Sequence, residues 1–161
     1  MHKLAHTAVP GSALQDVLWP TLPGAEGVRM LAMQYQFAQS ERWSAEALAA
    51  AQFAQLGHLL RQARSTVPFY RERLAGLALD QPLDAAVFAR IPLWRREDVQ
   101  DNFDSLASQA TPADHGRIYP GESSGSTGRP IRYLKTELND VFWHGFTLRD
   151  HLWQRRDFSG K

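Results

Sequence analysis

The chain contains no cysteine and no long run of apolar residues. Without thiols it can form no disulfide, thiolate metal site or cysteine nucleophile, and this composition fits a reducing compartment. No stretch approaches the ~20 apolar residues that a membrane-spanning helix needs, and the N-terminus lacks the apolar core of a secretory signal. We therefore expect a cytoplasmic protein that is not inserted into a membrane.

The chain also lacks an excess of either charge, because 18 basic and 17 acidic side chains leave a formal net charge of +1. The basic residues are scattered, so the sequence indicates no nucleic-acid partner. Hydrophobic residues make up 43% and charged residues 22% of the chain, as in an ordinary globular domain. The Walker phosphate loop and the Gly-x-Gly-x-x-Gly dinucleotide fingerprint are both absent.

The most informative segment that is present runs from Ser123 to Gly128 and is suited to hold a phosphate group. Gly125 and Gly128 permit backbone conformations closed to other residues, so successive amide groups can point toward an anion. Hydroxyl groups add further donors, and Thr127 could also give an oxygen to a magnesium ion carried by the phosphates. These hydroxyl groups belong to Ser123, Ser124, Ser126 and Thr127. A flexible Ser/Gly turn is the alternative interpretation.

Both flanks of this segment have the pattern of β-strands. Residues 117–119 and 131–134 alternate apolar and polar side chains and are rich in strand-forming types. Pro130 would close the loop rigidly, and Thr136 would begin a helix that runs to about Arg155. We therefore predict a strand, a phosphate loop, a second strand and a helix over residues 116–161.

The rest of the chain divides into two parts. Residues 1–27 are rich in proline and glycine and predict an irregular arm, with at most a short helix near residues 13–19. Residues 28–115 predict a helical region, in which Ser44 caps the longest helix. The expected helices cover residues 28–40, 44–65, 68–74, 84–88 and 95–102. An apolar stripe on the longest helix should face a core; it comprises Phe53, Leu56, Leu60, Ala63 and Val67.

The glycine-rich loop resembles the phosphate-binding signature of the adenylate-forming enzymes, Ser/Thr-Ser-Gly-Ser/Thr-Thr-Gly-x-Pro. Ser123 to Pro130 fit this signature. Upstream, the Val-Pro-Phe-Tyr-Arg turn within residues 52–74 and the Ile-Pro and Arg-Glu-Asp groups within residues 89–103 are similar to the phenylacetate-CoA ligase and CapK-like branch. The resemblance covers the chain from about Gln39 onward.

One departure from the family pattern concerns charge. Many members carry Lys or Arg directly after the loop proline, where this chain has Ile131. A cation for the polyphosphate would then come from Arg129 or Arg132. The resemblance implies that Arg129 and the residues from Ser123 to Gly128 bind ATP.

The resemblance implies an α/β fold, in which this chain is the opening part of the large adenylation domain. It also implies a two-step reaction with ATP and Mg²⁺ as cofactors and CoA as the co-substrate. A small-molecule carboxylic acid would become an acyl-adenylate and then a thioester. Enzymes of this branch are longer than this chain, so we expect the chain to be an N-terminal part that is inactive on its own. Because such enzymes are often dimers, the resemblance also leaves a homodimer as an open alternative.

Two alternatives remain. The loop could be vestigial in a non-catalytic remnant or interaction module, whereas the ligase fragment that the resemblance implies is expected to leave apolar surface uncovered. On the last helix, four side chains at spacings of three, four and seven could also build a metal site, although a solvated face is the simpler interpretation. They are Glu137, Asp140, His144 and His151. A Ser-His-Asp hydrolase is disfavoured, because Gly125 to Gly128 has the wrong spacing for a nucleophile elbow.

Overall fold

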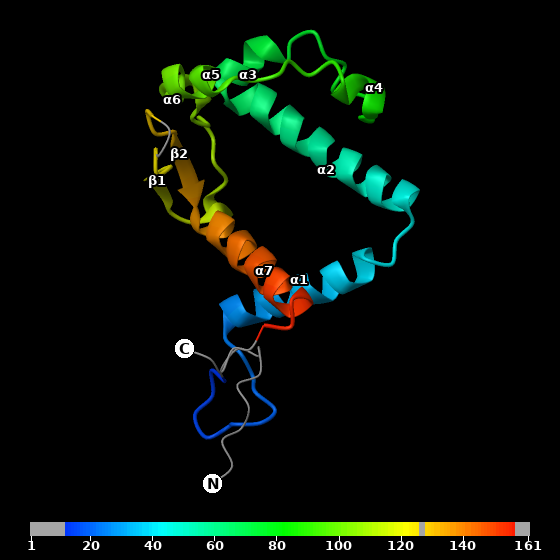
Figure 1. The fold of residues 1–161 in the computed structure, drawn as a ribbon, viewed down its shortest axis with the longest axis vertical. Coiled ribbons are helices and arrows are strands. Elements are labelled where there is room, and N and C mark those ends of the chain that lie inside the picture. Colours follow the sequence, from blue (N-terminus) through cyan, green and yellow to red (C-terminus); the bar gives the residue numbers. More distant parts are fainter. Residues whose placement is uncertain (1–11, 126–127, 157–161) are drawn as a thin grey trace. The chain divides into compact units, whose positions relative to one another are not determined.

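A computed structural model describes residues 12–125 and 128–156 (Figure 1). In these ranges the chain is rich in helices and has one small antiparallel sheet, which is a mixed α/β structure. The elements are α1 (Ala25–Ser40), α2 (Ala45–Thr66), α3 (Pro68–Arg73), α4 (Ala85–Phe88), α5 (Arg96–Asp101), α6 (Phe103–Leu106), the 3-10 turn η1 (Ala113–His115), β1 (Ile118–Glu122), β2 (Arg132–Thr136) and α7 (Glu137–Trp153).

The chain separates into two compact units. One combines the described parts of Met1–Arg42 and Leu138–Lys161, and the other is Trp43–Glu137. In the first unit α1 and α7 lie against each other (Figure 1). A Cβ atom at Gly145 would lie 2.9 Å from the sulfur of Met33, so the missing side chain permits this close approach. Gln34 donates to the Gly145 carbonyl over 2.8 Å, and Phe37 stacks on Phe146 at a ring-centre distance of 5.2 Å.

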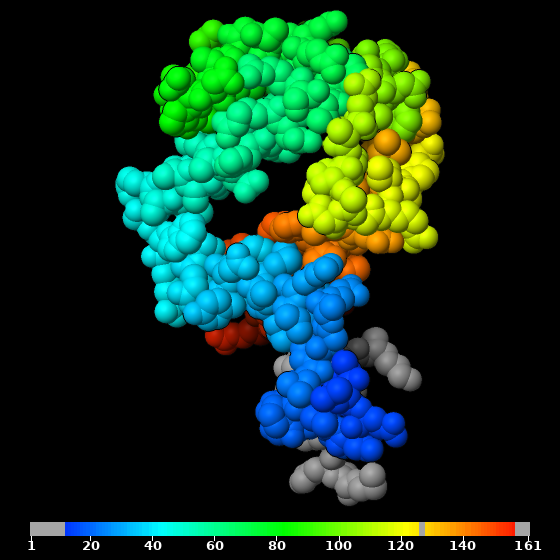
Figure 2. All heavy atoms as spheres, turned by 180° about the vertical axis from the view of Figure 1, so that it is seen from behind, coloured from blue at the N-terminus to red at the C-terminus, as the bar shows by residue number. Residues whose placement is uncertain are grey.

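The second unit is built on α2, which begins as the sequence predicts. The Ser44 side chain accepts a hydrogen bond from the Ala47 N–H over 3.2 Å and so caps the helix. The expected stripe turns inward: Leu60 and Val67 are buried, and Phe53 and Leu56 pack against the core. Figure 2 shows the green atoms of the segment after α3 lying directly on α2. The buried core cluster consists of Leu60, Leu74, Leu77, Leu79 and Leu83.

The sheet consists of the hairpin β1–β2, which carries the candidate loop. Its antiparallel register runs from Ile118 opposite Thr136 to Glu122 opposite Arg132. Both strands therefore end later than predicted. The ladder continues through Pro120 to Glu122 on β1 and reaches Thr136 on β2. In a two-stranded hairpin each strand is an edge, and an edge strand tolerates the missing N–H of proline.

Several element boundaries differ from the sequence prediction. The helix α1 begins at Ala25 rather than Val28, since Gly27 lies buried inside it instead of ending the arm. Residues 13–19 form bends and turns, and no helix, and the short helix α6 was not predicted. The last helix ends at Trp153, before Arg155, which has the left-handed φ of 49°.

Large apolar side chains remain open to solvent in both units, as the sequence led us to expect. Leu93 is 91% exposed in the second unit, and Trp143 on α7 is 70% exposed. Within the described ranges, none of the helices is both long enough and apolar enough to cross a lipid bilayer.

Candidate phosphate-binding loop

The candidate loop is tied together at its base by two hydrogen bonds between the same pair of residues. The Ser123 N–H donates to the Ile131 carbonyl over 2.9 Å, and the Ile131 N–H donates to the Ser123 hydroxyl oxygen over 2.8 Å. The Ser123 side chain thus continues the hairpin where the backbone ladder ends. Its role in this conformation is structural.

Two glycines shape the loop between these ends. Gly125 has φ of 62° and Gly128 has φ of 132°, both on the side of the map that favours glycine. A Cβ atom at Gly125 would lie 2.9 Å from the backbone oxygen of Gly128, so even alanine would be crowded there. The Gly128 N–H donates to the Gly125 carbonyl over 2.9 Å. That amide group is thus engaged within the protein.

The other predicted phosphate ligands lie at the tip of the loop or outside the described residues. Ser124 is exposed and Gly125 is half-buried. Ser126 and Thr127 lie outside the described residues, and with them the predicted contact between Thr127 and magnesium. The described part of the loop supplies the exposed Ser124 as a hydroxyl donor next to Gly125, whose φ suits glycine.

The far limb of the loop is held by α5. The Arg129 guanidinium lies 2.6 Å from a carboxylate oxygen of Asp101 and donates to the Gln100 carbonyl over 2.6 Å. In return, the Arg129 carbonyl accepts hydrogen bonds from Gln100 Nε2 and, over 3.0 Å, from Arg96 Nη2. Arg129, predicted as a cation for phosphate, is thus engaged by a neighbouring helix.

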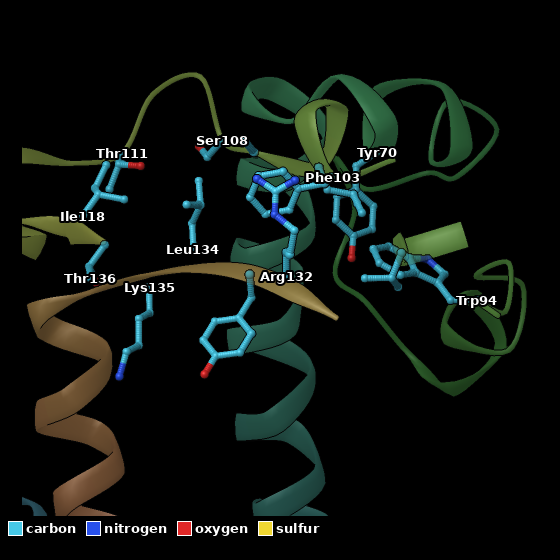
Figure 3. Close-up of a pocket in the computed structure, with 14 residues that line it drawn as sticks. Tyr70, Trp94, Phe103, Ser108, Thr111, Ile118, Arg132, Leu134, Lys135 and Thr136 are labelled. Atoms are coloured by element: carbon cyan, nitrogen blue, oxygen red, sulfur yellow. The ribbon is translucent and has the colours of Figure 1, made fainter. Parts of the chain in front are cut away.

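The other candidate cation, Arg132, is also engaged. Its guanidinium lies over the Phe103 ring, 4.0 Å from the ring centre, and Figure 3 shows the two side chains together. Such a contact is a cation–π interaction and directs the charge toward α6. Neither arginine that could replace the missing Lys or Arg at Ile131 therefore has its guanidinium free of contacts in this conformation.

A pocket of about 370 Å³ opens beside β2, between the strand and the short helices (Figure 3). Its size lies within the range of small-molecule sites, ~300–1,000 Å³. Along β2, Arg132 and Leu134 point into this region and Lys135 points to the opposite side (Figure 3). The labelled aromatic residues of its wall are Tyr70, Trp94 and Phe103.

Tyr70 forms part of a small aromatic cluster at this wall. Its ring centre lies 4.9 Å from that of Trp94, and Phe69 meets Trp94 edge-on at 5.2 Å. Burial raises the pKa of the Tyr70 hydroxyl, and the nearby positive charge of Arg73 partly opposes that rise. The sequence did not predict the pocket, because its aromatic residues come from α3, from the loop before α5 and from α6, and they share no period.

The sequence also did not predict a cluster of basic residues on the surface of the second unit. Arg61, Arg64 and Arg71 line one shallow surface hollow with Asp80 at its edge. Each guanidinium is within hydrogen-bond distance of a backbone carbonyl, and Arg64 also pairs with Asp80 at 3.2 Å. The Arg61 and Arg64 contacts tie α2 to the chain around Leu77 and Leu79, and the Arg71 contact ties α3 to Ser65 on α2, which gives the arginines a structural role.

The four residues considered for a metal site do not converge. Glu137 pairs with Arg117 at 3.4 Å, within the second unit, and His144 lies 3.5 Å from Glu26 in the first. Across residues 12–125 and 128–156, no group of three or more His, Asp or Glu side chains is placed to hold a metal ion. The structure assigns Glu137 and His144 to pairwise contacts.

One further motif was not recognised in the sequence. Gly121 to Gly125 has the order Gly-x-Ser-x-Gly of a hydrolase nucleophile elbow, with Ser123 at its centre. An elbow lies between a strand and a helix, whereas Ser123 lies between two paired strands and its hydroxyl accepts the Ile131 N–H. The local structure therefore gives the hydroxyl a different role from that of a nucleophile.

Comparison of the chain with protein-family models and with curated proteins gives no match.

Proposed function

We propose that this chain carries the ATP-phosphate loop of an adenylate-forming ligase similar to the phenylacetate-CoA ligase and CapK-like enzymes. The observation that carries the proposal is the run from Ser123 to Pro130, which fits the signature of that superfamily. Two structural features support it: the run joins two paired strands, and Gly125 and Gly128 adopt conformations that suit glycine.

In the proposed reaction, the carboxylate of a small organic acid attacks the α-phosphorus of ATP, and the bond to the bridging oxygen breaks as pyrophosphate leaves. The thiol of CoA then attacks the acyl-adenylate carbonyl and displaces AMP. The loop acts in the first step by holding the β- and γ-phosphates through its amide and hydroxyl donors. Bound Mg²⁺ would add charge neutralisation, with Thr127 as its proposed protein ligand.

This function requires a change within the loop. In the described conformation the Gly128 N–H is used internally, while the Ser123 hydroxyl accepts the Ile131 N–H and keeps its own O–H as a donor. Ser124 is exposed and can donate to a phosphate oxygen without breaking a described contact. We therefore expect binding to begin at Ser124 and to break the hydrogen bond between the Gly128 N–H and the Gly125 carbonyl, which would make amide exchange in the loop sensitive to ligand.

The test uses the full 161-residue chain titrated with magnesium pyrophosphate and, separately, with MgATP. Calorimetry measures affinity, and hydrogen exchange measures protection at residues 123–131. We expect saturable binding with protection confined to the loop, and weaker binding in the variant Ser124→Ala/Thr127→Ala. The control is Ser65→Ala on α2, far along the chain from the loop. Unchanged exchange in the loop at millimolar ligand would contradict the proposal.

A form of the protein that catalyses ATP–pyrophosphate exchange allows a kinetic test. Loss of preorganised donors that stabilise transition-state charge typically slows a reaction roughly 10²- to 10³-fold. We expect a loss of that order in Ser124→Ala/Thr127→Ala, with an unchanged rate in Ser65→Ala. An unaltered exchange rate in the double variant would remove the loop from the reaction.

The alternative function is that of a non-catalytic interaction module with a vestigial loop. The internal use of the Gly128 amide favours it, because this donor already has a partner. Under this alternative, the unfolding midpoint of the chain does not change with nucleotide, and amide exchange in residues 123–131 is the same with and without ATP. The titration above therefore separates the two functions.

A further inference from the structure

The far limb of the loop has an unusual density of contacts for an exposed segment. Both the side chain and the backbone carbonyl of Arg129 are bound by residues of one short helix, α5. The guanidinium reaches Asp101 and the Gln100 carbonyl, while Gln100 and Arg96 donate back to the Arg129 carbonyl. Two polar groups of one residue are thus held at once.

The helix α5 is closed at both ends by local hydrogen bonds. The Asp98 carboxylate accepts the Arg95 N–H over 2.9 Å at its start, and Asn102 donates to the Asp98 carbonyl over 2.8 Å at its end. Hydrogen bonds that satisfy helix ends stabilise a short helix that would otherwise be marginal. Asp101 and Gln100 therefore project from a short helix whose ends are satisfied.

We propose that Arg129 anchors the phosphate loop to α5, that Asp101 is a positioning residue acting through Arg129, and that Arg129 is not itself a phosphate ligand. The inference deepens the proposed function, and its predictions about pyrophosphate binding rest on that function. The ion pair between Arg129 and Asp101 neutralises the arginine, and moving the guanidinium to a polyphosphate would leave an unpaired carboxylate close to more negative charge. The contacts instead fix the limb that follows Gly128.

The variant Asp101→Asn distinguishes an anchoring role of Arg129 from a role as phosphate ligand, because the two roles predict opposite changes in pyrophosphate affinity. If Arg129 is an anchor, Asp101→Asn loosens the loop and weakens pyrophosphate binding, by about 2- to 5-fold for an exposed ion pair. If Arg129 is a ligand, the same change removes a competing carboxylate and strengthens binding. Asp104→Asn is the matched control, since it removes one negative charge from the adjacent helix α6.

Arg129→Lys gives a second comparison. Lysine keeps the positive charge but cannot reach Asp101 and the Gln100 carbonyl with a planar, two-pronged group. An anchor therefore predicts that Arg129→Lys behaves like Asp101→Asn, whereas a ligand that acts through charge alone predicts near wild-type affinity. In the double variant Arg129→Gln/Asp101→Asn, an anchor predicts no loss beyond that of Arg129→Gln.

Hydrogen exchange without ligand tests the anchor independently of the proposed function. We expect the Gly128 and Ile131 amides to exchange several-fold faster in Asp101→Asn than in wild type or Asp104→Asn. Unchanged exchange at both amides, or tighter pyrophosphate binding by Asp101→Asn, would overturn the inference. Faster exchange in a chain whose wild type does not bind pyrophosphate would support the anchor and contradict the phosphate function.

Discussion

The Ser123 hydroxyl accepts the N–H of Ile131, while the Ser123 N–H donates to the Ile131 carbonyl. One residue thereby uses its side chain to extend a backbone ladder that ends at Glu122 and Arg132. The pairing explains how a segment rich in serine and glycine keeps a defined base. It also separates Ser123 from the other hydroxyl residues that the sequence grouped with it.

We first predict that Ser123→Ala loosens the base of the loop. The Ile131 N–H is half-buried and would lose its partner, and such a hydrogen bond contributes about 1 kcal/mol. We expect roughly 5-fold faster exchange of the Ile131 amide, measured by NMR on the ligand-free chain. Ser124→Ala serves as the control, because Ser124 is exposed beside it. Equal exchange rates in the two variants would show that the Ser123 hydroxyl is dispensable for the hairpin.

We next predict that Gly125→Ala destabilises the loop. Its φ of 62° costs a residue with a Cβ about 1–2 kcal/mol, and the added atom would crowd the Gly128 carbonyl. The Gly128 amide should therefore exchange faster. Gly76→Ala is the control, since a Cβ there meets nothing within 4 Å. A Gly125→Ala chain with wild-type exchange at Gly128 would show that the loop does not need this conformation.

A third prediction concerns the start of α2. The Ser44 cap accepts the Ala47 N–H, and removing such a cap costs about 1 kcal/mol, so Ser44→Ala should lower the free energy of unfolding in urea. The control is Ser65→Ala at the opposite end of the same helix, where the hydroxyl only donates to the Gln62 carbonyl. The two variants should therefore differ in urea midpoint.

The pKa of Glu46 provides a second test of the Ser44 cap. Hydrogen bonds from its own backbone N–H and from the Ser44 hydroxyl hold the pKa of this carboxyl below its usual value. A lowered folded-state pKa stabilises the fold above the unfolded pKa, and that contribution is lost as pH falls through the folded value. Ser44→Ala should move the Glu46 pKa upward in an NMR titration, and an unmoved pKa would contradict the contact.

A fourth prediction concerns alkaline pH. Burial raises the pKa of Tyr70, so the folded chain holds this proton more tightly than the unfolded chain. Its stabilising contribution is complete below the unfolded pKa of about 10 and is lost as pH rises through the folded value. Unfolding measured between about pH 9 and 12 should therefore lose less stability in Tyr70→Phe than in wild type. Parallel curves for the two proteins would contradict the shift.

Much of the local structure could be predicted from short-range chemistry. Ser44 and Asp84 were expected to start helices, and each caps one by accepting a backbone N–H. Pro68 begins α3, where its missing N–H is not needed. The stripe on α2 from Phe53 to Val67 was confirmed as the side that packs on the core. These features depend on residues within one or two helical turns of each other.

The partners of individual side chains could not be predicted in the same way. Arg129 and Asp101, and Arg132 and Phe103, are brought together by the packing of the hairpin against α5 and α6. No sequence period links residues that lie so far apart in the chain. The pocket beside β2 was missed for the same reason, since its wall draws on several short helices.

By itself, the sequence determined where α2, α3 and α4 begin, which face of α2 is apolar, and that a glycine-rich loop lies between two strands. These properties follow from caps, hydrophobic spacing and backbone freedom, which act locally. Only the tertiary structure decided that Ser123 closes the hairpin and that Arg129 is held by α5. The physical reason is that an arginine or a hydroxyl bonds to whichever group folding brings within about 3 Å, and that neighbour is set by packing.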